Sequence, residues 1–478
     1  MNSIIQLNVE DNQSQAKLSL LIAHNDQQLN EQQNKQSKKR YNVISPRLSY
    51  WINIHKCWLC IIVIVSHISP LTKVEKSVAT ALIPHPFVAS GNSAVRLFFT
   101  FAAIFSMHSM QGLYIKHIDS TKDFITALLF QYVKRYFSTH GVLLVFGLGY
   151  APFLYWIFGE NGRDVYYQSW KTYKTYWLDW YLPIYLPWRP FNTDSISHSA
   201  WFSQQLVNVE FFFYIFYMVG YFLRKLINRQ LIWGVIFLPI MSFVCIIMEL
   251  QCPGCKHMIT YGIGVLFYWF RVIICSTKVG KYIIEQAYNK DTKSLIYRWI
   301  ISMVFIYLWL FMCRINNGPQ QFAQVPFCFF LMLDLIPFPK FNAFWQKIIN
   351  EITRLSMPIY ILHYSFLEKA APRNFPYITA LNQNIEVNHS WINAFSSWLY
   401  LLIFGMLSYP LWFMQRPLEV LPVWIKSIVE KKHFKNKKQF IIDLVLSFVG
   451  LSVSTILIIL AQTDVFGHDF VEKPPLQR

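Results

Sequence analysis

The chain has 478 residues, of which 54% are hydrophobic and only 14% are charged. A soluble protein of this length is expected to carry ~25% charged residues, and apolar runs of about 20 residues recur along this chain. The composition therefore excludes an ordinary soluble domain and predicts an all-α, polytopic helical bundle in a lipid bilayer. The formal charge of +18 would suit nucleic acid. However, the basic residues cluster in alternate short loops, which is typical of cytoplasmic loops, so we expect no nucleic-acid partner.

Residues 1–48 are rich in Gln and Asn and carry too little apolar content to fold alone. We therefore expect a disordered tail, and its sequence contains no signal peptide. The tail includes the basic stretch KQSKKRYNVISPR, just before the first apolar span. That stretch predicts a cytoplasmic N-terminus for a multi-pass membrane protein and leaves open which membrane it occupies.

The first span contains two ionisable residues, Lys56 and His67, within KCWLCIIVIVSH. Eleven residues of α-helix return a side chain to within ~20° of the same face, ~16 Å farther along the axis. We therefore expect Lys56 near the cytoplasmic head groups and His67 deeper on the same stripe. An ionisable residue inside a span is costly and indicates a function. The alternative for His67 is a hydrogen bond to a neighbouring helix.

The later apolar runs bring the number of expected spans to eleven, and their loops follow the charge rule. Before the third span, residues 123–137 have the pattern of an amphipathic helix at the membrane interface. After it comes a Trp- and Tyr-rich external segment at 159–200. The spans after the first are expected near 95–115, 139–158, 203–223, 231–250, 257–275, 299–313, 325–338, 352–368, 391–414 and 440–461.

These features divide the chain into four parts. After the tail, residues 49–415 form the membrane core, and residues 416–439 form a basic cytoplasmic loop. Residues 440–478 add one further span and a short external tail. Asn388-His389-Ser390 is an N-glycosylation acceptor pattern on the expected external side.

Few ionisable side chains lie within or beside the later spans. Arg135, next to Lys134 at the expected cytoplasmic entrance of the third span, is either an ordinary positive anchor or part of a site. Glu210, in LVNVEFFFYIFYM, needs a partner or a wet cavity at its depth, which favours a role in a site. Tyr360 and His363, in SMPIYILHYSF, are further candidates.

Two Cys-x-x-Cys pairs resemble halves of a zinc site, at Cys57 and Cys60 and at Cys252 and Cys255. The expected topology places the first pair toward the cytoplasm and the second outside. The two pairs should therefore not meet, and we expect no metal site.

Five motifs in order along the chain together resemble the membrane-bound acyltransferase type 3 family. The first span of that family carries Arg or Lys, ten residues and then His, as from Lys56 to His67. GNSAVRLFF at 91–99 is similar to its second span, VKRYF to its third, LVNVEFFFYIFY to its glutamate motif and SMPIYILH to its late histidine motif. The resemblance covers about 50–415. Ser138 stands where the family has the second arginine of Arg-x-x-Arg, so Lys134 would have to supply that contact.

The resemblance implies transfer of an acyl group, commonly acetyl, from acyl-CoA to a hydroxyl of a sugar, glycolipid or small molecule. It implies no tightly bound cofactor, since acyl-CoA is the donor substrate. Lys56, Lys134 and Arg135 would hold the phosphates of coenzyme A. His67 would take the proton of the acceptor hydroxyl or become acylated itself. Glu210 would orient the imidazole or the hydroxyl.

Two other functions remain open on the sequence. The substituted motifs suit an inactive relative that binds a lipid or small molecule. A buried histidine and glutamate also occur in the proton relays of transporters. Hydrolysis of acetyl-CoA that depends on His67 would separate the acyltransferase from both.

Overall fold

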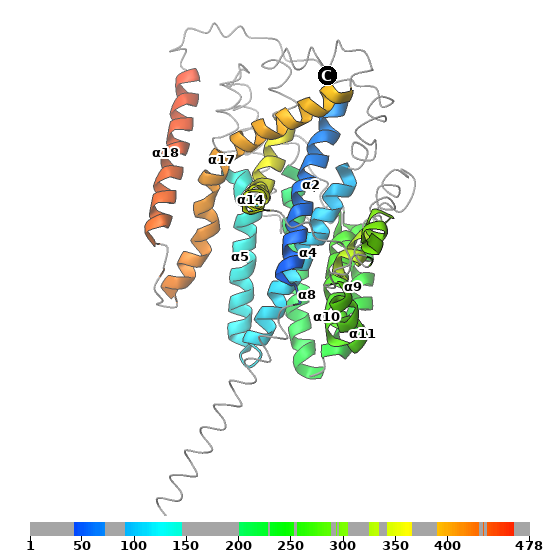
Figure 1. The fold of residues 1–478 in the computed structure, drawn as a ribbon. Coiled ribbons are helices and arrows are strands. Elements are labelled where there is room, and N and C mark those ends of the chain that lie inside the picture. The colour runs from blue at the N-terminus through cyan, green and yellow to red at the C-terminus, as the bar shows by residue number, and fades with distance from the viewer. Residues whose placement is uncertain are drawn as a thin grey trace, which may run out of the picture.

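The computed structural model describes residues 43–71, 91–145, 200–227, 230–252, 256–287, 296–304, 325–333, 342–365, 390–429 and 437–462, with Lys293 and Phe434. These residues form α-helices and short connections, so the all-α prediction is confirmed for them (Figure 1). The N-terminal tail, most of the aromatic segment 159–200 and the asparagine of the glycosylation pattern lie outside the described residues.

Helix α2 (Pro46–Leu71) starts well before Lys56. Ser45 Oγ accepts a hydrogen bond from the backbone N–H of Leu48 at 3.1 Å. Pro46 suits the first turn, where a backbone N–H would have no partner in the helix. Lys56 is therefore about 15 Å inside the helix, and His67 lies near its C-terminal end. The helix thus begins ten residues before Lys56, and the expected position of Lys56 near the cytoplasmic head groups stays a prediction.

Helices α4 (Gly91–Lys116), α5 (Thr121–Val145) and α8 (Ala200–Ile227) stand side by side in the bundle (Figure 1). The helix expected over 123–137 is part of the longer helix α5, and its expected position at the membrane interface stays a prediction. Ser120 Oγ accepts a hydrogen bond from the N–H of Asp123 at its start. The buried ring of Phe124 stacks on Tyr221 of α8, with 3.9 Å between ring centroids. This first turn therefore contributes Phe124 to the core, while Lys122, Asp123 and Ile125 are exposed.

Helices α9 (Gln230–Gln251), α10 (Met258–Ser276) and α11 (Lys278–Ala287) follow α8. Helix α10 packs closely against α4. A Cβ at Gly264 would overlap the carbonyl oxygen of Thr100 and lie 2.6 Å from the Cβ of Ala103. Only glycine allows this approach of the two backbones.

The C-terminal part contains α13 (Val325–Met332), α14 (Ala343–Ser365), α17 (Ser390–Val429) and α18 (Lys437–Gln462). Helix α17 runs through the loop expected at 416–439 as far as Val429, so that expected loop is largely helical. It contains three prolines and changes direction along its length (Figure 1). Helix α18 packs at its side, where Arg416 and Asp443 form an ion pair of 2.9 Å.

Two described stretches, Trp201–Arg224 and Met258–Ser276, are long and apolar enough to cross a membrane by length and composition. Two shorter apolar stretches lie at Leu48–Ile64 and Ile236–Gln251. Large apolar side chains are also exposed along α9 and α18. They include Ile236, Ile240, Phe243, Ile246, Ile247, Leu250, Ile441, Leu444, Val445, Phe448, Val449, Val453 and Ile456.

Candidate functional site

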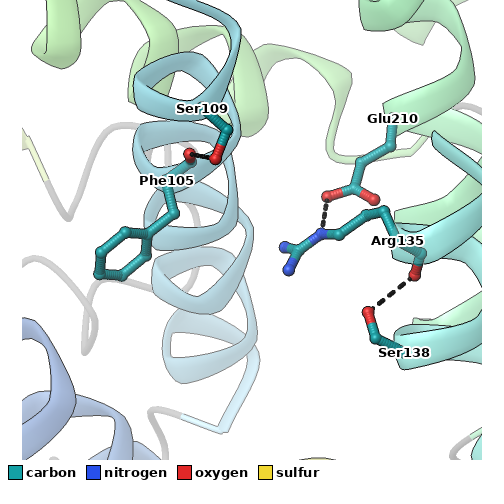
Figure 2. Close-up of polar contacts among 5 residues, drawn as sticks. All are labelled: Phe105, Ser109, Arg135, Ser138 and Glu210. Carbon is teal, nitrogen blue, oxygen red and sulfur yellow. Dashed lines mark hydrogen bonds and ion pairs between the residues drawn. The ribbon is translucent and has the colours of Figure 1, made fainter. Parts of the chain in front are cut away.

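Arg135 of α5 and Glu210 of α8 form an ion pair inside the bundle. The Nε of Arg135 donates to Oε1 of Glu210 at 2.8 Å (Figure 2). The glutamate side chain is 1% exposed and the arginine side chain 31%. A buried carboxylate needs such a partner, because removal from water is costly. The two terminal nitrogens of the guanidinium point away from Glu210, toward the side of α4 (Figure 2).

The ion pair belongs to an antiparallel seam between α5 and α8. Each contact along the seam joins one α5 residue to one α8 residue, and the residue numbers rise on one helix as they fall on the other. The contacts are Phe124–Tyr221, Tyr132–Tyr214 with centroids 5.2 Å apart, Arg135–Glu210 and His140–Ser203. The register of this seam is what brings Glu210 opposite Arg135.

Lys56 joins the same group from α2. Its Nζ lies 4.8 Å from the ring centroid of Phe105 on α4, within the range of a cation–π contact. The ammonium also interacts electrostatically with the guanidinium of Arg135. Among the described residues, Glu210 is the one carboxylate in an ion pair with Arg135, and no described carboxylate forms an ion pair with Lys56. With its three groups ionised, the cluster of Lys56, Arg135 and Glu210 carries one net positive charge.

Hydroxyl groups surround Glu210. The hydroxyls of Tyr214, Tyr217 and Tyr261 interact electrostatically with its carboxylate, and Ser106 of α4 lies among them. The side-chain oxygens of Ser106, Tyr217 and Tyr261 are buried and lie within interaction range of one another, and the Tyr261 hydroxyl also interacts with the carboxylate of Glu210. Because none of these contacts has full hydrogen-bond geometry, the cluster has room for a bridging water or a polar ligand group.

Lys134 does not join Lys56 and Arg135. Its side chain is exposed, and it interacts electrostatically with Glu419 of α17. Ser138, at the position of the second arginine in the family motif, donates to the backbone oxygen of Arg135 at 2.9 Å (Figure 2). The described cations of the group are therefore Lys56 and Arg135.

Tyr360 and His363 lie on α14, which packs against α2. The buried ring of Tyr360 lies 4.7 Å from that of Phe202. Its hydroxyl interacts electrostatically with Cys60, one turn beyond Lys56 on α2. His363 is fully buried, and its Nδ1 donates to the backbone oxygen of Tyr360 at 2.6 Å. Tyr360 thus lies near the stripe of Lys56, and His363 makes a local hydrogen bond.

The described part of the structure includes the backbone of His67 on α2 and not its side chain. Its expected pairing with Glu210 stays a prediction. The carboxylate of Glu210 is paired with Arg135, a residue that the sequence assigned to donor binding.

Sequence reasoning missed a buried histidine in the α5–α8 seam. Ser203 Oγ donates to the backbone oxygen of Thr139 at 2.9 Å, which uses its only hydrogen. The Nδ1 of His140, 3.3 Å away, must then donate to Ser203. This arrangement favours the tautomer with an unprotonated Nε2. The sequence signal was the short distance along the chain between Arg135 and His140. It was missed because the third span was expected to begin at 139, so that Arg135 was assigned to the loop before it.

Among the described residues, no group of three or more His, Cys, Asp or Glu side chains is placed to hold a metal ion. No family model, curated protein or solved structure matches the chain. The functional argument therefore depends on the geometry of the polar group in the bundle.

Proposed function

We propose that this chain is a multi-pass membrane acyltransferase with a cytoplasmic N-terminus and about eleven spans. It would move an acyl group, acetyl in the first instance, from acyl-CoA to a hydroxyl of a carbohydrate, glycolipid or small molecule. The observation that carries the proposal is the group of Lys56, Arg135 and Glu210, which places an excess positive charge inside an apolar bundle.

Two features support the location in a membrane. The stretches Trp201–Arg224 and Met258–Ser276 have the length and composition of spans. The outward sides of α9 and α18 expose large aliphatic and aromatic side chains, and water would disfavour so much contiguous apolar surface. A bilayer would cover it without any further protein.

The charge of the polar group supports binding of the acyl donor. An uncompensated cation is costly in a low-dielectric bundle, so an anionic ligand would be bound favourably there. Nε of Arg135 is held by Glu210, and its terminal nitrogens remain for a bidentate contact with a phosphate. The ammonium of Lys56 adds a second contact from α2. Coenzyme A supplies phosphates that match both.

The ion pair adds a second proposed role for Glu210, beside the expected one of orienting His67 or the acceptor hydroxyl. In this role it would hold the guanidinium of Arg135 in the geometry that receives the donor. That makes Glu210 a positioning residue, since it acts on the donor through Arg135.

The chemical step would depend on His67, which lies beyond Lys56 on α2. In direct transfer, the neutral imidazole takes the proton of the acceptor hydroxyl while the oxygen attacks the thioester carbonyl carbon. A carbon–oxygen bond forms, the carbon–sulfur bond breaks, and the departing thiolate of coenzyme A takes the proton from the imidazolium. In the acyl-histidine route, an imidazole nitrogen attacks the thioester carbonyl carbon, the carbon–sulfur bond breaks, and coenzyme A leaves as the thiol with the proton of the imidazole. The acceptor oxygen then attacks the acyl-histidine, the carbon–nitrogen bond breaks, and the imidazole takes back the proton of the hydroxyl.

The experiment is release of coenzyme A from acetyl-CoA by the purified full chain in detergent. Slow release is expected from the wild type, and none above background from His67→Ala. Lys122→Ala is the matched control, because this lysine is exposed at the start of α5. A wild type that binds coenzyme A tightly without releasing any from acetyl-CoA would favour the binding-protein or transporter alternative.

The topology is tested separately. A cysteine at Asn388 should react with an impermeant thiol reagent applied from outside, and one at Lys437 should react only after permeabilisation. The wild type, with its native cysteines, gives the background. The reverse labelling pattern would overturn the proposed orientation.

A further inference from the structure

Helix α11 is fixed to the end of α10 by a short joint. Thr277 Oγ1 accepts a hydrogen bond from the N–H of Gly280 at 3.1 Å, and the carbonyl of Thr277 accepts one from Lys281 at the same distance. A Cβ at Gly280 would overlap the backbone oxygen of Ile274. The glycine thus lets α11 turn directly against the end of α10, so its position relative to that helix is set by backbone contacts.

The first two turns of α11 expose apolar side chains and lysines, and Glu285 and Gln286 are exposed near its C-terminal end. Val279 and Tyr282 are 70% and 62% exposed, although both are largely apolar. Lys278 and Lys281, beside them in the sequence, are exposed as well. The next described helical stretch, 296–304, continues this character through the exposed Tyr297 and Trp299. Water solvates the ammonium groups of the lysines favourably, whereas contact between water and the apolar side chains is unfavourable.

The position of α11 next to α10 indicates which kind of partner its exposed side chains would contact. Met258–Ser276 is one of the two stretches that could cross a membrane, and α11 begins two residues after it. If α10 crosses the bilayer, α11 must lie at its surface. At that level aromatic and aliphatic side chains enter the boundary of the acyl chains, while lysines extend to the head groups.

We propose that α11 lies in the cytoplasmic head-group layer and binds anionic lipids through Lys278 and Lys281, with Val279 and Tyr282 inserted beside them. The negative surface of that leaflet complements the lysines and the net charge of +18. The inference depends on the membrane location and orientation in the proposed function, and it does not depend on acyl transfer.

The test uses the full chain in lipid nanodiscs made of phosphatidylcholine with a titrated fraction of phosphatidylserine. The measured quantity is the enrichment of phosphatidylserine around the protein. The variant Lys278→Gln/Lys281→Gln should weaken it about 25-fold, since each lysine near a membrane surface contributes roughly fivefold. The control Lys278→Arg/Lys281→Arg keeps both positive charges at the same positions and should change it less than twofold.

Insertion is measured with a nitroxide attached at Tyr282→Cys, with the labelled wild type as background for the native cysteines. The label should be more accessible to oxygen than to a water-soluble relaxation agent. An equal loss of phosphatidylserine in both lysine variants would overturn the inference, and so would a label fully exposed to water. Failure of the wild type to insert would overturn the membrane location as well, whereas an inactive but inserted protein would count only against acyl transfer.

Discussion

Arg135 and Glu210 form an ion pair whose two side chains differ in solvent exposure. The carboxylate is 1% exposed and held at 2.8 Å by Nε of the arginine, whose side chain is 31% exposed. Glu210 therefore acts from inside the bundle on a guanidinium that is still available to a ligand. This asymmetry distinguishes a binding group from a closed structural pair.

Removing one partner of this pair should cost more stability than removing both. Glu210→Leu leaves the guanidinium beside Lys56 without its carboxylate, and breaking a buried pair typically costs about 3–5 kcal/mol. The loss should fall below that range because Arg135 is partly exposed. The double variant Arg135→Met/Glu210→Leu should unfold closer to the wild-type temperature. Thermal unfolding of the wild type, Arg135→Met, Glu210→Leu and the double variant in detergent gives the coupling energy, and additive effects would contradict a functional pairing.

Substitutions of Arg135 and of its neighbour Lys134 should differ in their effect on the affinity for coenzyme A. Arg135→Met and Lys56→Met should each weaken coenzyme A binding at least tenfold, because each removes a cation of the buried group. Lys134→Met should change it less than twofold, since that side chain is exposed and interacts with Glu419. Lys56→Arg should retain part of the affinity. Titration calorimetry measures all four, and equal losses at positions 134 and 135 would return Lys134 to the site.

The sequence predicted the helical class because apolar runs of membrane length dominate the chain. It misplaced helix limits where polar residues interrupt those runs. Arg135 marked an expected boundary, although α5 continues through it because Glu210 compensates its charge. The start of α2 carried a readable signal in Ser45-Pro46, which hydrophobic periodicity does not register. The pairing of Arg135 with Glu210 was not readable, because it depends on the register between two helices.

The contact of α4 with α10 should be highly sensitive to one methyl group. Gly264→Ala would force the Cβ against the Thr100 backbone oxygen and Ala103, so the helices must separate. Overpacking of this kind costs about 1–3 kcal/mol. Gly405→Ala, in helix α17, is the matched control because a Cβ there meets nothing within 4 Å. A lower unfolding temperature is expected for the first variant only, and an unchanged Gly264→Ala would contradict the close approach.

The two histidines, His67 on α2 and His140 on α5, should differ in their effect on transfer. His67→Ala should lower turnover about 10²–10⁴-fold with coenzyme A affinity kept, as expected for loss of a proton acceptor. His140 is hydrogen-bonded to Ser203, whose hydroxyl donates to the backbone oxygen of Thr139. We therefore expect His140 to stabilise the α5–α8 seam. His140→Gln should lower the unfolding temperature and cost less than tenfold in turnover. Rates of acetyl transfer, measured against pH with and without added imidazole, distinguish the roles of the two histidines. Imidazole should restore part of the activity of His67→Ala and none of the activity of His140→Gln. If His140→Gln lost as much activity as His67→Ala at normal stability, the proton acceptor would have to be reassigned to α5.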